Sequence, residues 1–173
     1  MRIVAGRWRG RRIEAPPGSS VRPTLDRVRE AWMSILQLEI PGATVLDLFS
    51  GSGALGLECL SRGAVSADFV EKDPRTLVVL KRNVETLGAG EQVRIHRADA
   101  LRYAASLDPV AFKLAFADPP YTGGIAEELA GLWLKRPFSS ILSVEHDSRT
   151  KLPPGGETRR YGSSAITFYR TGD

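Results

Sequence analysis

Short apolar runs that suit buried strands alternate with helical segments from Ala43 onward, and this alternation constrains the fold more than any other feature. Alternating strands and helices form a mainly parallel sheet with helices on both faces. The sequence therefore predicts an α/β fold with a seven-stranded, mainly parallel sheet whose last two strands form an antiparallel hairpin. The predicted strands cover residues 44–48, 67–71, 93–96, 114–117, 141–145, 158–161 and 165–169. The predicted helices in this part cover residues 54–60, 74–87 and 125–134.

The first forty residues follow a different pattern. Short strands are predicted over residues 2–5 and 11–14, and a helix from an N-cap at Thr24 to about Leu38. We therefore expect a small extension, made of a hairpin and a helix, in front of the sheet. The predicted domains are this extension, residues 1–40, and a second domain, residues 41–173.

The extension also holds the excess positive charge. Residues 1–30 contain eight arginines, no lysine and three acidic side chains, whereas the rest of the chain is close to neutral. Arginine binds phosphate through a planar fork and stacks on bases. Two interpretations stay open, a solvated basic arm that keeps the protein soluble and a nucleic-acid contact surface.

Composition excludes several other classes of protein. Hydrophobic residues make up 42% and charged residues 25% of the chain, which is typical of a globular domain. No apolar run is long enough for a membrane span, and the N-terminus lacks the apolar core of a signal peptide. One cysteine and two histidines are too few for a disulfide or a Cys/His zinc site, and Cys59 is expected in the core. We expect a cytoplasmic protein without a metal.

A glycine-rich loop joins the first strand of the predicted sheet to its helix. Gly51, Gly53 and Gly56 match the pattern G-x-G-x-x-G, and Glu71 ends the next strand, where a ribose-binding carboxylate belongs. This pattern fits a nicotinamide dehydrogenase, an S-adenosylmethionine enzyme or a turn that binds nothing. Asp47 favours S-adenosylmethionine, because a carboxylate at this place repels a pyrophosphate and suits an ammonium group.

Two further acidic residues follow later strands of the predicted sheet. Asp99 can contact an adenine amine or cap the following helix, and both interpretations stay open. The fourth strand runs into the sequence Asp118-Pro119-Pro120-Tyr121. The prolines fix the backbone and leave carbonyl groups free to accept hydrogen bonds. Because the carboxyl ends of such strands meet in one crevice, this turn and the glycine loop are expected to lie together.

These motifs resemble those of a known family. The Asp-Pro-Pro-Tyr sequence resembles motif IV of the amino methyltransferases, (Asn/Asp/Ser)-Pro-Pro-(Tyr/Phe/Trp), and the glycine loop resembles their motif I. Over most of its length the chain is similar to the bacterial 16S ribosomal RNA guanine-N2 methyltransferases, the RsmD family. Ser50 departs from the family pattern, which often has alanine. The stretches that carry the resemblance are 6–11, 22–24, 26–30, 47–56, 118–121 and 144–145.

The resemblance implies a Rossmann-like class I methyltransferase fold and transfer of a methyl group from S-adenosylmethionine to the exocyclic N2 of a guanine, with S-adenosylhomocysteine as product and no metal. Asp118, Pro119 and Tyr121 are the implied catalytic residues. The implied cofactor-binding residues are Asp47, Phe49, Ser50, Gly51, Gly53, Glu71, Lys72, Asp99, Ala100 and Asp118. RNA contacts are expected at Arg7, Trp8, Arg9, Arg11, Arg22, Thr24 and Arg27.

The same resemblance sets the expected partners. The substrate is 16S ribosomal RNA, in an assembled or partly assembled 30S particle, and the protein is expected to be a monomer without a membrane partner. Residues 22–24 either close over the methionine end of the cofactor or simply cap a helix.

Three alternatives remain, an amino methyltransferase for DNA adenine N6, one for a protein glutamine, and an RNA-binding module without catalysis. DNA enzymes of this class usually carry a target-recognition domain, for which 173 residues leave no room. The glutamine enzymes resemble Asn-Pro-Pro-Tyr, whereas this chain has Asp118. An intact Asp-Pro-Pro-Tyr sequence beside an intact glycine loop disfavours the module without catalysis.

Overall fold

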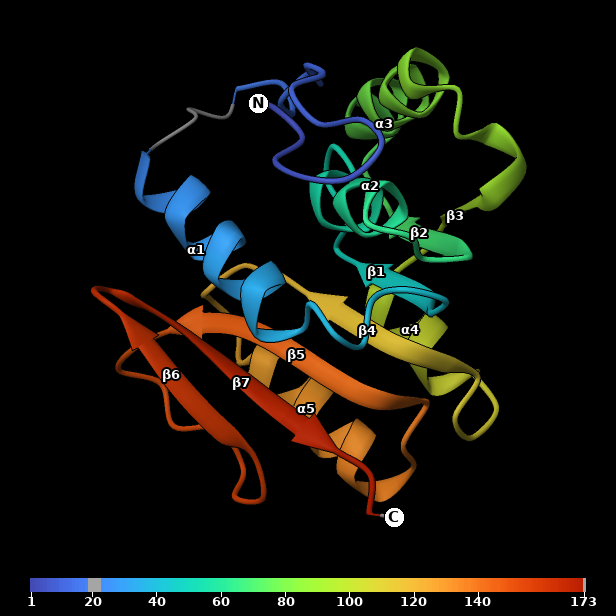
Figure 1. Cartoon of the computed structure of the whole chain (residues 1–173). Coiled ribbons are helices and arrows are strands. Elements are labelled where there is room, and N and C mark those ends of the chain that lie inside the picture. Colours follow the sequence, from blue (N-terminus) through green and yellow to red (C-terminus); the bar gives the residue numbers. More distant parts are fainter. Residues whose placement is uncertain (19–22, 173) are drawn as a thin grey trace.

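A seven-stranded sheet forms the centre of the fold, as the alternation of strands and helices predicts (Figure 1). The computed structural model describes residues 1–18 and 23–172, with only the backbone for Pro23 and Thr24. The strands are β1 (Thr44–Leu48), β2 (Ser66–Glu71), β3 (Val93–Arg97), β4 (Phe112–Ala117), β5 (Ser139–Asp147), β6 (Glu157–Tyr161) and β7 (Ser164–Arg170). Their order is β3-β2-β1-β4-β5-β7-β6; β1 to β5 are parallel, and β7 is antiparallel to both neighbours.

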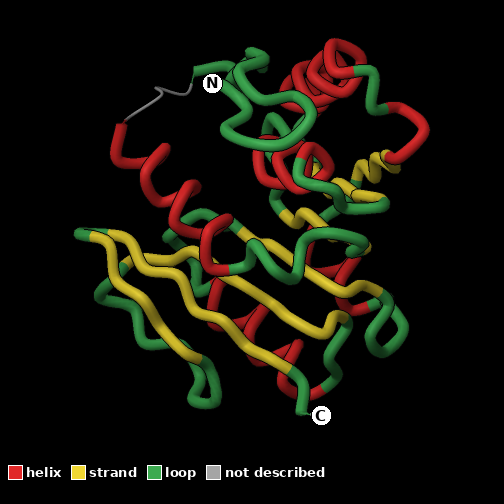
Figure 2. Tube along the Cα trace, in the orientation of Figure 1, coloured by secondary structure: helices red, strands yellow, loops and turns green. Residues whose placement is uncertain are grey.

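Helices cover both faces of this sheet (Figures 1 and 2). One face is covered by α1 (Pro23–Ile35), α2 (Ala54–Ser61) and α3 (Pro74–Leu87), and the other by α4 (Ala100–Ala105) and α5 (Ile125–Lys135). The buried side chains accordingly form two clusters. Trp32 and Leu60 belong to the first cluster, and Leu129 and Trp133 to the second. None of the helices in the described part of the chain is long and apolar enough to cross a membrane.

The first helix begins and ends earlier than predicted. It starts at Pro23 and ends at Ile35, whereas the sequence indicates a cap at Thr24 and an end near Leu38. Proline suits the first helical position, because its missing N–H has no partner there in any case. Thr24 therefore lies within the first turn and is not the N-cap.

The two strands predicted before this helix reduce to one isolated antiparallel bridge between Arg2 and Arg12. The reason is a competing acceptor on α2. The backbone N–H groups of Val4 and Ala5 donate to the carboxylate of Glu58, at 2.9 and 3.1 Å, and not to a neighbouring strand. A ladder of backbone hydrogen bonds cannot continue through these residues.

Buried polar side chains hold the extension against the sheet domain. Glu58 is only 1% exposed, and Ser61 accepts a hydrogen bond from the Trp8 N–H and donates one to the Ala5 carbonyl. Asn83 of α3 bonds both backbone groups of Glu14. The same amide donates to the carbonyl of Ser52 in the glycine loop. Residues 1–18 thus connect directly to the two helices beside this loop.

The extension also shares the core of the sheet domain. Ile3, Trp8 and Ile13 are buried in the same cluster as the side chains of α1, α2 and α3. A boundary between two domains at residue 40 stays a prediction, but residues 1–18 do not pack separately from the sheet.

The close approach at Gly6 yields a stability prediction. Gly6 has φ +85°, and a Cβ there would lie 1.9 Å from the carbonyl oxygen of Ser61. Gly10 has φ +83° but open space around the same position, so it is a matched control. Gly10→Ala should cost about 1–2 kcal/mol for its left-handed backbone. Gly6→Ala should cost about 1–3 kcal/mol more, because the backbone must also move. Urea unfolding measures both, and equal losses would contradict the close docking.

Candidate active site

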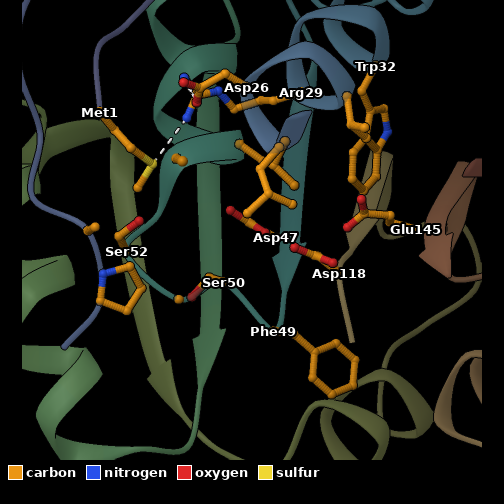
Figure 3. A pocket seen from close by; sticks show the side chains of 17 residues that line it. Met1, Asp26, Arg29, Trp32, Asp47, Phe49, Ser50, Ser52, Asp118 and Glu145 are labelled. Carbon is orange, nitrogen blue, oxygen red and sulfur yellow. Dashed lines mark hydrogen bonds and ion pairs between the residues drawn. The ribbon is translucent and has the colours of Figure 1, made fainter. Parts of the chain in front are cut away.

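Two cavities meet at the carboxyl ends of the central parallel strands. The first, of about 260 Å³, lies beside the glycine loop and α1, and Asp47 and Trp32 contribute to its lining (Figure 3). The second, of about 300 Å³, is lined by residues at or just after the ends of β2, β3 and β4, among them Glu71, the last residue of β2. Phe49 and Asp118 line both cavities. Ligands of open α/β sheets bind at this edge, next to the strand where the sheet order reverses.

The glycine loop is shaped by close packing. A Cβ at Gly53 would lie 2.5 Å from a Leu80 methyl group, and a Cβ at Gly56 would lie 2.4 Å from the Phe69 ring. These two glycines therefore allow the loop, α2 and β2 to approach one another. Gly51 has space for a side chain, with only a Pro16 atom at 3.6 Å, but its φ is +56°.

Asp47 is a buried acid with an unused acceptor. It is 1% exposed, and its Oδ2 accepts a hydrogen bond of 3.0 Å from the Gly56 N–H. Its Oδ1 and the Ser50 hydroxyl are buried and have no partner among the described residues. Burial raises the pKa of Asp47 well above its usual range, and the nearby Asp118 and Glu71 carboxylates raise it further. A buried group of this kind would be satisfied by a cation that donates hydrogen bonds.

Glu71 fixes the turn between the loop and β2. Its Oε1 accepts from the Gly51 N–H at 3.0 Å, and its Oε2 accepts from the Lys72 and Asp73 N–H groups at 3.0 and 2.9 Å. A carboxylate offers about four acceptor positions, so capacity remains on the side of the second cavity. Lys72 and Ala100 line the same cavity.

Asp99 caps the helix α4, one of the two roles left open by the sequence. Its Oδ2 accepts a hydrogen bond of 3.0 Å from the Arg102 N–H. The residue also lines the second cavity, so the cap does not exclude a contact with a ligand. The adenine contact stays a prediction.

The Asp-Pro-Pro-Tyr turn lies at the junction of the two cavities. Asp118 is exposed and lines both of them, and Pro119 and Pro120 line the second. Tyr121 is 47% exposed, and its hydroxyl lies 2.8 Å from the Ser164 hydroxyl on β7. Among the described residues, the lining of the two cavities does not include Tyr121. The structure thus places Asp118 centrally and Tyr121 at the margin.

Glu145 is a site residue that the sequence reasoning missed. It lies near the end of β5, is 5% exposed and lines the first cavity. In Figure 3 the carboxyl groups of Asp47, Asp118 and Glu145 converge on one space. Burial and the adjacent Asp118 raise the pKa of Glu145 to about 9. Its signal in the sequence was a carboxylate at the end of the predicted strand 141–145, in a stretch, 144–145, that carries the family resemblance but was given no role.

The helix α1 forms the opposite wall of the first cavity. Arg29 donates to the Met1 sulfur at 3.2 Å and to the Arg2 carbonyl at 3.1 Å, and it lies 3.6 Å from the Asp26 carboxylate (Figure 3). The Trp32 indole donates to the Ser143 hydroxyl at 2.7 Å. From the sequence, this helix was expected to pack on the sheet and to contribute RNA contacts at Thr24 and Arg27, but Arg29 and Trp32 were not predicted as site residues.

The expected RNA-contact residues fall into different environments. Trp8 is 8% exposed, and the Arg7 guanidinium lies 4.1 Å from the centre of its ring. Its ring is therefore part of the core and not a free stacking surface. Arg7 also bonds the Gln92 side chain, and Arg11 donates to the Thr86 carbonyl at 2.8 Å. These two arginines hold the extension against the sheet domain.

Other members of the same group are free or lie outside the described residues. Arg9 and Arg27 are exposed, and their side chains make no hydrogen bond or ion pair with the described part of the chain. Arg22 lies outside the described residues, as does the side chain of Thr24. Closure of residues 22–24 over a cofactor therefore stays a prediction.

A family model described as "Conserved hypothetical protein 95" matches residues 1–170. The chain belongs to this family. It is the RsmD family that the sequence motifs indicate. The "Ribosomal RNA small subunit methyltransferase D" of Escherichia coli K12 is 38% identical over 88% of this chain and 78% of its own length.

Solved structures share the fold. A hypothetical protein of Thermus thermophilus is 33% identical, with a TM-score of 0.83 over 99% of both chains. An RNA methyltransferase of Salinibacter ruber, solved with S-adenosyl-L-homocysteine, is 12% identical over 88% of this chain and 93% of its own, with a TM-score of 0.66. The fold is therefore that of the Rossmann-like class I methyltransferases, as the sequence predicts.

The raised pKa of Asp47 has a consequence for stability. The folded protein holds this proton more tightly than the unfolded chain, so the stabilisation is complete below pH of about 4 and is lost as the pH rises through the raised pKa. Asp47→Asn should therefore gain free energy of unfolding relative to wild type between pH 5 and pH 8. Urea unfolding of the ligand-free protein at both values measures it.

Asp73→Asn is the control with the opposite sign. Hydrogen bonds from Thr76 lower the pKa of Asp73, so its stabilising effect is present above pH of about 4 and is lost as the pH falls. This variant should lose stability relative to wild type at pH 8. If the free energy of unfolding of Asp47→Asn does not rise relative to wild type between pH 5 and pH 8, Asp47 is not a buried acid without a compensating partner.

Proposed function

We propose that this protein transfers a methyl group from S-adenosylmethionine to the exocyclic N2 of a guanine in 16S ribosomal RNA. The observation that carries the proposal is the position of the Asp-Pro-Pro-Tyr turn, at the junction of two cavities beside the glycine loop. The name of the Escherichia coli relative, a ribosomal RNA methyltransferase, supports ribosomal RNA as the substrate class.

The residues present suit the cofactor. The unused Oδ1 of Asp47 is the acceptor that the ammonium group of the methionine part needs. The remaining acceptor capacity of Glu71 suits the ribose hydroxyls, and Asp99 and Ala100 suit the adenine side of the second cavity. When bound, S-adenosylmethionine supplies the methyl group on a sulfonium centre.

The turn after β4 would activate the methyl acceptor. An aromatic amine is a poor nucleophile, because its lone pair is delocalised into the ring. The Asp118 carboxylate and the Pro119 carbonyl would accept its N–H bonds and so direct the lone pair outward. The Asp118 charge also favours the cationic product before its proton leaves. Tyr121 would stack on the base, since nearly half of its surface is exposed.

The RNA would reach this turn past the extension. Arg9 and Arg27 are the exposed arginines of the expected group that no other described residue binds. Their guanidinium groups suit phosphate contacts, which position the RNA without reading its sequence. The target base must leave its stack, which costs little in a loop.

A product assay tests the proposal. The protein is incubated with methyl-labelled S-adenosylmethionine and 30S particles, free 16S ribosomal RNA, DNA or protein. The RNA comes from a strain that lacks this protein, and the nucleosides are identified by mass spectrometry after digestion. N2-methylguanosine is the expected product. Label in N6-methyladenine of DNA or in a protein glutamine would overturn the proposal in favour of those substrates.

The central position of Asp118 predicts the effect of its removal. Asp118→Ala should lower turnover by about 10²–10³, the usual effect of one lost electrostatic group. Cofactor binding, measured by calorimetry, should remain largely intact, because the proposed cofactor contacts include Asp47 and Glu71 on other strands. An unchanged turnover number would exclude the role assigned to Asp118.

The free arginines predict a change in RNA binding. The double variant Arg9→Ala, Arg27→Ala should bind RNA more weakly, with a log–log salt slope shallower by about 0.7 per lost contact on single strands and 0.9 on a duplex. The matched control is Lys113→Ala, Lys135→Ala, which removes the same charge from exposed lysines outside the extension. Both affinities come from filter binding over a salt series. Equal slopes in the two variants would assign the RNA to another surface.

A further inference from the structure

Glu145 and Asp118 lie side by side because of the register of their strands. Ala117 of β4 pairs with Val144 of β5 in a parallel register, and each acidic residue directly follows its paired neighbour. Side chains that follow paired residues of parallel strands point to the same face of the sheet, and both carboxyl groups line the first cavity, where they lie close enough to share a hydrogen bond (Figure 3). Two carboxyl groups can share a hydrogen bond only when one of them holds a proton. Glu145 is buried and Asp118 is exposed, so the proton belongs on Glu145.

Ser164 on β7 lies between this pair and the tyrosine of the same turn. Its hydroxyl is close enough to the Glu145 carboxyl group to lower the pKa of that group. The same hydroxyl lies 2.8 Å from the hydroxyl of Tyr121. The first and last residues of the Asp-Pro-Pro-Tyr turn are thus linked through two residues on other strands.

A protonated Glu145 has one proton to donate, and the adjacent Asp118 carboxylate accepts it. In the contact between Tyr121 and Ser164, either hydroxyl can be the donor. A network of such groups orients its members more firmly than separate pairs do.

We infer that Glu145 is a positioning residue, whose protonated carboxyl group holds the Asp118 carboxylate in place and, through Ser164, fixes Tyr121. Glu145 acts on the reaction through Asp118 and does not itself take part in methyl transfer. This inference rests on the proposed function for the reaction, but the network exists in the protein without substrate.

The groups around Glu145 favour its protonated form. The acidic groups nearby are Asp118 after β4 and Asp47 on β1, and the α1 residues Asp26 and Arg29 line the same cavity. Burial is the main cause that raises the pKa of Glu145 to about 9, and Asp118 raises it further, whereas Ser164 lowers it. The proton is therefore present at neutral pH and is lost as the pH rises through this value.

A titration tests the network without any assay of activity. The side-chain carboxyl carbons of glutamate are labelled with ¹³C, and the Glu145 signal is assigned by its absence in Glu145→Gln. In wild type this signal should titrate near pH 9, and in Asp118→Asn its pKa should move toward the ordinary value of 4.5. A titration near 4.5 in wild type, or one that ignores Asp118→Asn, would overturn the inference.

Kinetics then separate positioning from a merely structural role. Glu145→Gln keeps a neutral donor toward Asp118 and an acceptor for Ser164, so its turnover below pH 8 should stay close to that of wild type. Its loss of activity in alkali should be weaker, because the amide cannot ionise. Ionisation of the RNA affects both proteins equally and cancels in the comparison. Glu145→Ala should lower kcat by about 10- to 100-fold, as for one hydrogen bond to a charged group, with the KM for S-adenosylmethionine nearly unchanged.

A second buried acid provides the control. Asp68 on β2 is 6% exposed and pairs with His96 at 2.8 Å, so Asp68→Asn removes a buried carboxylate elsewhere in the sheet. Its pH profile should match that of wild type. If Glu145→Gln also keeps the wild-type profile, or Glu145→Ala keeps the wild-type kcat, Glu145 is not a positioning residue. If wild type produces no N2-methylguanosine while Glu145 titrates as expected, the proposed function fails and the network stands.

Discussion

The arrangement of the site depends on three carboxyl groups that the sheet brings to one edge. The neighbouring strands β1, β4 and β5 carry Asp47, Asp118 and Glu145 at or just after their carboxyl ends. Asp47 and Glu145 are almost fully buried. Buried carboxylates repel one another and lack water, so Asp47 and Glu145 have raised pKa values. In the free protein, loss of water therefore disfavours the charged forms of both side chains. A cationic ligand would favour the charged form of Asp47, which links the protonation of this residue to what the site binds.

The extension is part of this site and not only a basic arm. Its backbone is held by Glu58 and Ser61 of α2, and Met1 reaches the wall of the first cavity. Part of the arginine content serves the same docking, since Arg7 and Arg11 bond other elements. The positive charge of the extension therefore has two uses. Some arginines hold the extension in place, and the exposed ones remain for the proposed contact with phosphate.

The two catalytic roles proposed for the Asp-Pro-Pro-Tyr turn require different degrees of freedom. Asp118 must accept a hydrogen bond in a fixed direction, whereas a stacking ring tolerates some movement. The network through Glu145 and Ser164 answers both needs, because it holds the carboxylate directly and the tyrosine only by its hydroxyl. The ring of Tyr121 stays partly exposed at the margin of the cavities. Approach of the RNA base from outside is compatible with this geometry.

The sequence by itself determined the elements and the kinds of chemistry. The signals were local ones: apolar periodicity, the glycine loop, and Pro74 and Gly88 at the ends of α3. They allowed the strands and most helix limits to be predicted. They also placed Asp47, Glu71 and Asp118 at one edge of the sheet. Only the tertiary structure decided which side chains contact one another. Val4 and Ala5 dock on Glu58, 54 and 53 positions away, and Glu145 lies beside Asp118, about 27 positions away, while Trp8 is buried in a cluster that reaches to Phe168. Such contacts depend on how helices and strands pack and on strand register, which periodicity does not encode, and they decide which polar groups lose their water.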